Sequence, residues 1–83
     1  MILLYFAWVR QKLGTGQEWI EIPSRVRTVR DLAEHLRERG GAFEEIFSDL
    51  GRLRVAVDQE HAVWEAHLGT AREVAFFPPV TGG

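Results

Sequence analysis

The sequence contains no cysteine among its 83 residues. Disulfide bonds, thiolate nucleophiles and cysteine-ligated metal sites are therefore excluded, and any sulfur that the protein handles must be held elsewhere. A long hydrophobic run is also missing. The longest, residues 1–9, has neither the basic start nor the cleavage site of a signal peptide and is too short to span a bilayer. We therefore expect a cytoplasmic protein with no membrane partner.

The chain has no strong excess of charge of either sign. Ten basic and twelve acidic residues give a formal net charge of −2, and they are spread along the chain without a basic stripe. Because binding to a phosphate backbone depends on clustered Lys and Arg, we expect no nucleic-acid partner. The three histidines lack the spacing of a metal site, and Glu18, Glu44 and Glu45 accompany no nucleophile, so we expect all of them to be solvated.

A hydrophobic content of 46% in a chain of this length predicts one small domain with a single core. Residues 2–6 are continuously apolar, as in a strand buried on both faces, and residues 7–13 are expected to form a helical turn or two before a loop at residues 14–16. Residues 19–22 alternate between apolar and polar side chains. They predict a half-buried strand that ends at Pro23.

The middle of the chain carries two helical patterns. Thr28 stands three residues before Asp31, a variant of the capping box, and apolar residues follow at positions 29, 32, 33 and 36. We expect the main helix here, with Gly40 and Gly41 ending it. A shorter apolar stripe at positions 43, 46, 47 and 50 predicts a second helix that Gly51 breaks.

The remaining regular segments are predicted strands. Residues 53–57 alternate, and the polar residues 58–60 predict a turn into a short apolar piece at residues 62–64, giving a hairpin. In the last strand, residues 73–77, Val74 and Phe76 share one face, whereas Phe77 points outward. The fold expected from this order is an α+β roll: a mixed sheet packed on one main helix plus short helices, with the first and last strands paired in parallel at its centre.

The composition changes abruptly after Phe77, where the sequence continues as Pro78-Pro79-Val80-Thr81-Gly82-Gly83. We divide the chain there into a domain of residues 1–77 and an extended tail of residues 78–83. The prolines favour extended geometry, so six residues can reach on the order of 20 Å at roughly 3.3 Å each. Because glycine has no Cβ, a partner can enclose the last two residues in a narrow channel, with the Gly83 carboxylate at its far end.

A tail of this kind suits delivery of its own terminus. A carboxylate is a poor electrophile and a poor sulfur donor, so Gly83 needs activation, and we expect an acyl-adenylate made by a separate ATP-using enzyme. Sulfur can then replace AMP. The thiocarboxylate that results carries negative charge on a polarizable sulfur and can act as a nucleophile, as a thiolate does. No side chain of this protein needs to be catalytic, and we expect it to bind no cofactor or metal.

The run from Glu73 to Gly83 resembles the C-terminal signature of the small subunit of molybdopterin synthase, a sulfur-carrier family with the ubiquitin-like β-grasp fold. Residues 6–10, Phe-Ala-Trp-Val-Arg, followed by Gly14, are similar to that family's opening strand and first turn. Residues 55–59, Val-Ala-Val-Asp-Gln, fall where its middle hairpin stands. Asp58 replaces the expected asparagine there, although both residues suit a turn.

The resemblance implies that an E1-like enzyme adenylates Gly83 and that a sulfurtransferase helps to convert it to a thiocarboxylate, with Gly82 giving the tail passage. The tail then enters the large subunit of molybdopterin synthase, whose side chains hold a cyclic pyranopterin precursor, and its sulfur helps to build the dithiolene of molybdopterin. The assembled synthase is typically a heterotetramer of two small and two large subunits. The present chain would be its non-catalytic sulfur donor.

An outward aromatic residue at the base of a delivery tail is a natural anchor for a partner. We therefore predict a partner-binding surface in which the domain contributes Phe77, Phe6 and His61. The tail continues this surface through Pro78, Pro79, Val80 and Thr81.

Three alternatives stay open. The chain could be a protein modifier conjugated to lysines through Gly83, a sulfur carrier for another pathway such as thiamine biosynthesis, or an interaction domain whose tail is incidental. The stretch Phe-Phe-Pro-Pro-Val-Thr at residues 76–81 favours the molybdopterin branch over thiamine.

Overall fold

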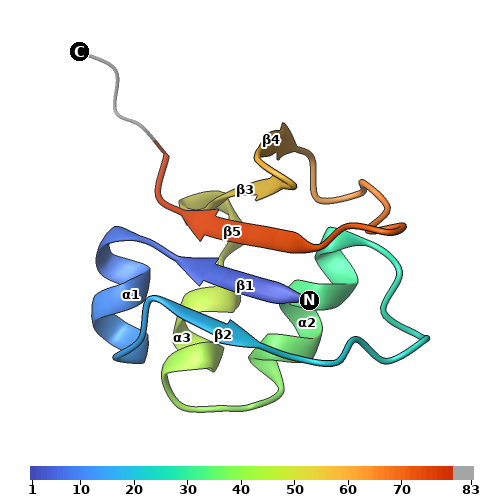
Figure 1. The fold of residues 1–83 in the computed structure, drawn as a ribbon. Helices are drawn as coiled ribbons and strands as arrows, with labels where there is room; N and C mark the ends of the chain where they lie inside the picture. The colour runs from blue at the N-terminus through green and yellow to red at the C-terminus, as the bar shows by residue number, and fades with distance from the viewer. Residues whose placement is uncertain (80–83) are drawn as a thin grey trace.

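Across residues 1–79, the part of the chain that the computed structural model describes, five strands form one mixed sheet with helices against one face (Figure 1). The predicted tail residues Val80, Thr81, Gly82 and Gly83 lie outside the described residues. The strands are β1 (Ile2–Tyr5), β2 (Gln17–Trp19), β3 (Arg54–Val57), β4 (Glu60–Ala62) and β5 (Glu73–Phe77). The helices are α1 (Ala7–Leu13), α2 (Val29–Arg37), α3 (Ala42–Phe47) and the short 3₁₀ helix η1 (Leu50–Arg52).

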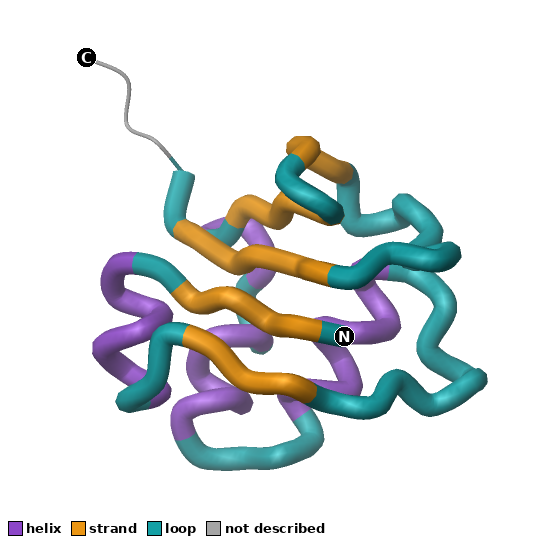
Figure 2. Tube along the Cα trace, viewed as in Figure 1, coloured by secondary structure: helices purple, strands orange, loops and turns teal. Residues whose placement is uncertain are grey.

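The strands follow the order β2-β1-β5-β3-β4 across the sheet. β1 and β5 run parallel, with Ile2 opposite Glu73 and Tyr5 opposite Phe76, and the other neighbours are antiparallel. Figure 2 shows the strands as one layer with α2 and α3 behind it. The first and last strands therefore meet in the interior of the sheet, as their apolar composition predicted, and the last strand is held on both edges.

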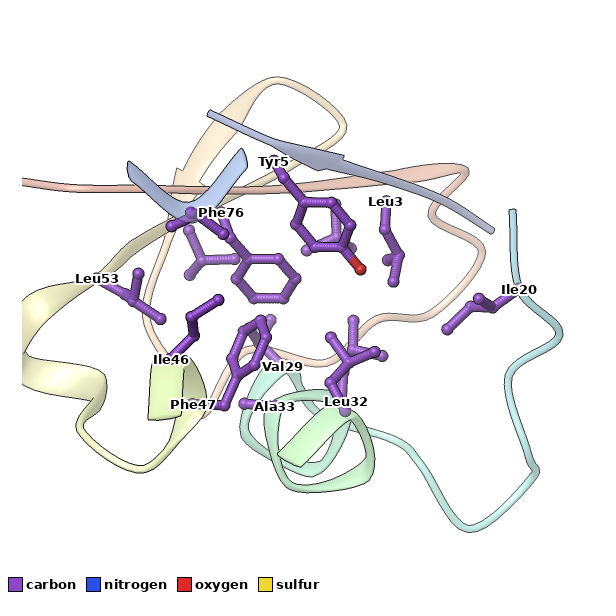
Figure 3. Packing of buried hydrophobic residues seen from close by; sticks show 14 of the residues in the cluster. Leu3, Tyr5, Ile20, Val29, Leu32, Ala33, Ile46, Phe47, Leu53 and Phe76 are labelled. Carbon is purple, nitrogen blue, oxygen red and sulfur yellow. The ribbon is translucent and has the colours of Figure 1, made fainter. Parts of the chain in front are cut away.

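The core lies between this sheet and the helices (Figure 3). Alternate residues of the interior strands point into it, and α2 presents an apolar stripe at a spacing of three to four residues toward the same layer. Phe47 of α3 meets Phe76 edge to face, with ring centroids 5.0 Å apart. The core residues that are fully buried include Leu3, Tyr5, Val29, Leu32, Ala33, Leu36, Phe47, Leu53, Val74 and Phe76.

The start of α2 confirms the predicted capping box. The Thr28 hydroxyl accepts a hydrogen bond from the Asp31 N–H at 3.1 Å, and the Asp31 carboxylate accepts from the Thr28 N–H at 3.1 Å. The Arg27 N–H also donates to this carboxylate, at 3.0 Å. These backbone donors hold the pKa of Asp31 below its usual value, because they favour the charged form.

The second strand lies earlier in the chain than the sequence predicted. We expected residues 19–22, but β2 spans Gln17–Trp19 and shares only Trp19 with that range. The register explains the difference. β1 offers partners from Ile2, opposite Trp19, to Leu4, opposite Gln17, and the backbone pairing of Ile20 with Met1 is the last before β1 runs out. The hydrogen-bonded ladder between β1 and β2 ends there because β1 has no further residues to pair with, three residues before Pro23.

The hairpin also differs from the expected one. Residues 62–64 were predicted as its second strand, whereas β4 is Glu60–Ala62. Asp58 and Gln59 both have positive φ, 47° and 70°, and this tight two-residue turn places Glu60 directly opposite Val57. The Asp58 carboxylate accepts hydrogen bonds from the backbone N–H groups that open β5, at 2.9 and 3.0 Å. The turn is therefore tied to the last strand.

Two smaller predictions are also wrong. Gly51 does not break the second helix, because α3 already ends at Phe47 and Gly51 lies inside η1. Glu18 is not a freely solvated carboxylate. It lies opposite Leu3, on the core side of β2, and accepts hydrogen bonds from the Tyr5 hydroxyl at 2.7 Å and from Arg39 at 2.6 Å.

Candidate functional site

The base of the tail is the end of the middle strand of the sheet. Phe76 is fully buried and packs against the rings of Phe47 and Trp64, with centroids 5.0 and 6.4 Å away. Its carbonyl accepts a hydrogen bond from the N–H of Phe6 at 3.2 Å. β5 ends one residue later, at Phe77, and the half-buried Pro78 and Pro79 follow. The tail therefore begins from a strand that is fixed by core packing and by neighbours on both edges.

The structure brings two of the three predicted anchor residues into contact. The side chain of Phe77 lies on the face of the sheet opposite to Phe76, and it meets the His61 ring edge to face with centroids 5.5 Å apart. Phe6 is 48% exposed and adjoins them through its backbone bond to Phe76, at the end of β1. The assignment of Phe77, Phe6 and His61 to partner binding stays a prediction, but all three lie at the tail end of the sheet.

The outer face of the sheet, which α2 and α3 leave uncovered, extends the apolar surface beyond these residues. Ile2 and Trp19 are cross-strand neighbours on it and are 41% and 65% exposed. The exposed Arg54 of the neighbouring strand β3 pairs with Phe77 across the sheet, so the two residues lie side by side. The sequence analysis missed these residues. For Ile2 the alternation with Leu3 was an available signal, but Arg54 became part of the surface only through the pairing of β3 with β5.

The charged side chains of residues 1–79 are all at least partly exposed. Within residues 1–79 there is no cluster of three or more metal-ligating side chains, and Tyr5, whose hydroxyl donates to Glu18, is the only ionisable residue that is buried. Each altered pKa has an ordinary structural cause: burial and then the hydrogen bond to Glu18 raise the pKa of Tyr5, and the Lys12 ammonium lowers that of Glu45. None of the helices in this part of the chain has the length and hydrophobicity to cross a bilayer.

Comparison with known protein families gives one decisive match. The model of the ThiS family aligns with residues 3–83, which include all of the tail. The chain belongs to the ThiS family. Two relatives of similar sequence are the molybdopterin synthase sulfur carrier subunits of Escherichia coli K12, at 37% identity, and of Haemophilus influenzae, at 33%. Each alignment covers 98% of this chain and 96% of the relative.

Solved structures agree with this ThiS-family assignment. SAMP1 of Haloferax volcanii superposes with a TM-score of 0.74 at 26% identity, covering 99% of this chain and 97% of that one. A Pyrococcus furiosus protein described as a molybdopterin converting factor, subunit 1, gives a TM-score of 0.73 at 32% identity, with 95% of each chain covered. The ubiquitin-like β-grasp fold predicted from the sequence is thereby confirmed.

Proposed function

We propose that this chain is the sulfur-carrier subunit of a molybdopterin synthase, and that the thiocarboxylate form of Gly83 supplies sulfur for the dithiolene of molybdopterin. One observation carries the proposal: sulfur carrier subunits of molybdopterin synthase align with nearly the whole chain at 33% to 37% identity. The family model aligns through residue 83, so the aligned region includes Gly82 and Gly83. These glycines lie outside the described residues, and their roles rest on sequence and chemistry.

In the proposed cycle, the Gly83 carboxylate attacks the α-phosphate of ATP on an E1-like enzyme, which releases pyrophosphate and leaves an acyl-adenylate. A persulfide on the sulfurtransferase then attacks the acyl carbon and displaces AMP, and a thiol reductant cleaves the resulting acyl disulfide to the thiocarboxylate. The chain contributes the acyl group, and ATP is bound by the activating enzyme. In this proposal these steps take place inside the partner enzymes.

The large synthase subunit and the activating enzyme would both bind the tail end of the sheet. The His61 and Phe77 rings form an aromatic surface where β5 ends, and Arg54, which pairs with Phe77, adds positive charge at the edge of that surface. An aromatic residue with a polar rim is the usual composition of an interface hot spot. In this proposal the synthase is a heterotetramer of two small and two large subunits, located in the cytoplasm.

Intact-mass spectrometry tests the proposed chemistry. After incubation with ATP, an activating enzyme and a sulfur donor, the chain should gain the mass difference between a sulfur and an oxygen atom. A variant that lacks Gly83 should gain nothing, as should a reaction without ATP. The Escherichia coli relative serves as the positive control. If the relative is converted and the present chain is not, the proposed function is wrong.

A second candidate, a protein modifier joined to lysines through Gly83, is supported by the likeness to SAMP1, described as small archaeal modifier protein 1 of Haloferax volcanii. The two functions share the activated terminus and differ in the acceptor. Conjugation predicts adducts of higher mass in cell lysates that disappear when Gly83 is deleted. A lysate with free carrier and thiocarboxylate alone would favour the sulfur-carrier function.

A further inference from the structure

A groove of about 720 Å³ lies at the end of the sheet where β1 and β5 begin. One wall continues from β2, and the other is the loop that leads into β5. Its volume is within the range of known ligand sites. The lining residues that matter here are Trp19, Ile22, Val26, Arg27, His67 and Leu68.

The walls combine apolar surface with positive charge. Val26 and Leu68 are buried and form an apolar base, while the Trp19 ring at the rim is 65% exposed. Arg27 takes part in none of the ion pairs found within residues 1–79. Glu21 supplies an acidic side chain to the same lining. The groove thus offers Arg27, which forms none of these close ion pairs and has Asp31 as a more distant electrostatic neighbour, beside an aromatic ring and aliphatic side chains.

The backbone around the groove is held in place. The Leu68 N–H donates to the Arg27 carbonyl at 2.8 Å, and Thr28 and His67 form an isolated antiparallel bridge. Arg27 is also fixed through its own N–H, which donates to the Asp31 carboxylate. The two sides are therefore joined at the backbone of Arg27 and Thr28, so the groove is a preformed feature of the fold.

The chemistry of the tail complements this groove. Proline-rich segments bind aromatic-lined grooves because they are already extended before binding, and residues 78–80 read Pro-Pro-Val. A terminal carboxylate pairs well with a guanidinium, through two parallel charge-assisted hydrogen bonds. Two glycines before that carboxylate permit close approach to the backbone.

The tail of the same molecule does not start near its own groove. β5 begins at Glu73, next to the groove loop, and runs to Phe77, so a five-residue strand separates the groove from the base of the tail. Figure 1 shows that the strand ends at the edge of the sheet away from this loop. The strand directs residue 78 away from the groove. A tail from the same molecule would have to turn back along the whole length of β5, so the geometry favours a tail that comes from another molecule.

We propose that the groove binds residues 78–83 of a second copy of this chain, with Pro78 and Pro79 against Trp19 and the Gly83 carboxylate on Arg27. The proposal rests on the proposed function for the free carboxylate at Gly83. Tail and groove are different surfaces, so the contact is heterologous and adds copies head to tail without closing. At high carrier concentration it shields the terminus, and the activating enzyme must compete with the groove for the tail.

A peptide titration tests the contact directly. The probe is the acetylated decapeptide of residues 74–83 with a free carboxylate, added to the isotope-labelled full chain at low concentration and followed by amide chemical shifts. We expect shifts confined to the segments that line the groove: residues 19–22, 26–27 and 67–69. The same peptide with an amidated terminus should bind about tenfold or more weakly, because a charge-assisted hydrogen bond is lost.

Two matched variants distinguish a specific contact with the Arg27 guanidinium from a general effect of positive charge on peptide affinity. Arg27→Ala should lower the affinity for the peptide by about tenfold or more. Arg10→Ala removes the same charge from α1, outside the groove, and should leave affinity within about twofold. The Arg27 backbone bond to Asp31 does not need the side chain, so both variants should keep the melting temperature of the parent. A folded Arg27→Ala variant that binds normally overturns the proposal.

Sedimentation equilibrium of the full chain is the second measurement. The mean mass should rise with concentration for the parent and for Arg10→Ala, and remain monomeric for Arg27→Ala and for a chain that lacks Gly82 and Gly83. Peptide shifts confined to the tail end of the sheet, around His61 and Phe77, or no shifts at millimolar peptide, would refute the groove assignment. Thiocarboxylate formation is measured separately, on the parent and on Arg27→Ala. If the parent forms no thiocarboxylate, the proposed function is wrong. If the parent forms it but does not bind the peptide, the groove assignment is wrong.

Discussion

Phe76 and Phe77 are adjacent in the sequence but face opposite sides of the sheet, and this difference supports a sharp prediction. Phe76 is fully buried among aromatic rings, whereas Phe77 is half-buried on the outer face and touches His61. We compare Phe77→Asp with Phe76→Ala. The first should disable docking at the tail end of the sheet while leaving the fold intact, and the second should destabilise the fold.

The magnitudes follow from the contacts. Removing a buried phenylalanine costs about 3–5 kcal/mol, and a chain of this length has roughly 4–12 kcal/mol of stability in total. Phe76→Ala therefore consumes a large part of it. Phe77 loses mainly one edge-to-face contact, about 0.5–1.5 kcal/mol. A central aromatic anchor contributes about 2 kcal/mol or more to binding, so Phe77→Asp should lower the affinity for the partner roughly 30-fold or more.

Urea unfolding followed by tryptophan fluorescence gives the stability of each variant, and calorimetric titration with the large synthase subunit gives the affinity. Phe77→Asp should unfold near the parent midpoint and bind poorly. If Phe77→Asp lost as much stability as Phe76→Ala, Phe77 would be a core residue. If it kept full affinity at normal stability, the tail end of the sheet would not be the docking surface.

Three further predictions concern the fold. Burial and the hydrogen bond to Glu18 raise the pKa of Tyr5, the sole tyrosine. The stability that Tyr5 contributes should be complete below the usual tyrosine pKa of about 10 and should decline above it, because the unfolded state then ionises. In an alkaline titration, phenolate absorbance should therefore appear together with unfolding. Ionisation of Tyr5 in the folded protein at the usual pKa would contradict this. Thr28→Ala should cost about 1 kcal/mol in urea unfolding, since it removes the acceptor for the Asp31 N–H, and an unchanged midpoint would show that the capping box contributes little. Gln59→Gly should raise stability by about 0.5–1 kcal/mol, because Gln59 has a φ of 70° in the hairpin turn; a loss of stability would indicate an unrecognised contact of its side chain.

Local patterns were sufficient where the interactions are local. The capping box at Thr28 needs residues no more than three apart, and the last strand, Glu73–Phe77, was predicted with correct bounds and faces because its alternation is strong. β2 and β4 were misplaced because their limits depend on a partner. β2 stops where β1 runs out, and β4 starts where the turn at Asp58 and Gln59 places Glu60 opposite Val57.

The candidate site divides in the same way. The Gly82-Gly83 pair and its proline base were visible in the sequence, since they are one contiguous motif. The aromatic contact between His61 and Phe77 was expected as a patch, but its geometry depends on where the hairpin folds back beside β5. Alternation placed Arg54 and Trp19 on the faces opposite their apolar neighbours, but it gave no signal for their part in a binding surface, because their neighbours on that surface are distant in the sequence.

The sequence by itself determined the class of fold, the position of the main helix and the family, because hydrophobic periodicity, capping and the terminal motif are written in consecutive residues. The tertiary structure alone decided which residues share a surface. Strand pairing placed Arg54 beside Phe77, and it put Trp19 and Arg27 around a single groove at the other end of the sheet. Such neighbours are set by the register between segments far apart in the chain, which one-dimensional patterns do not encode.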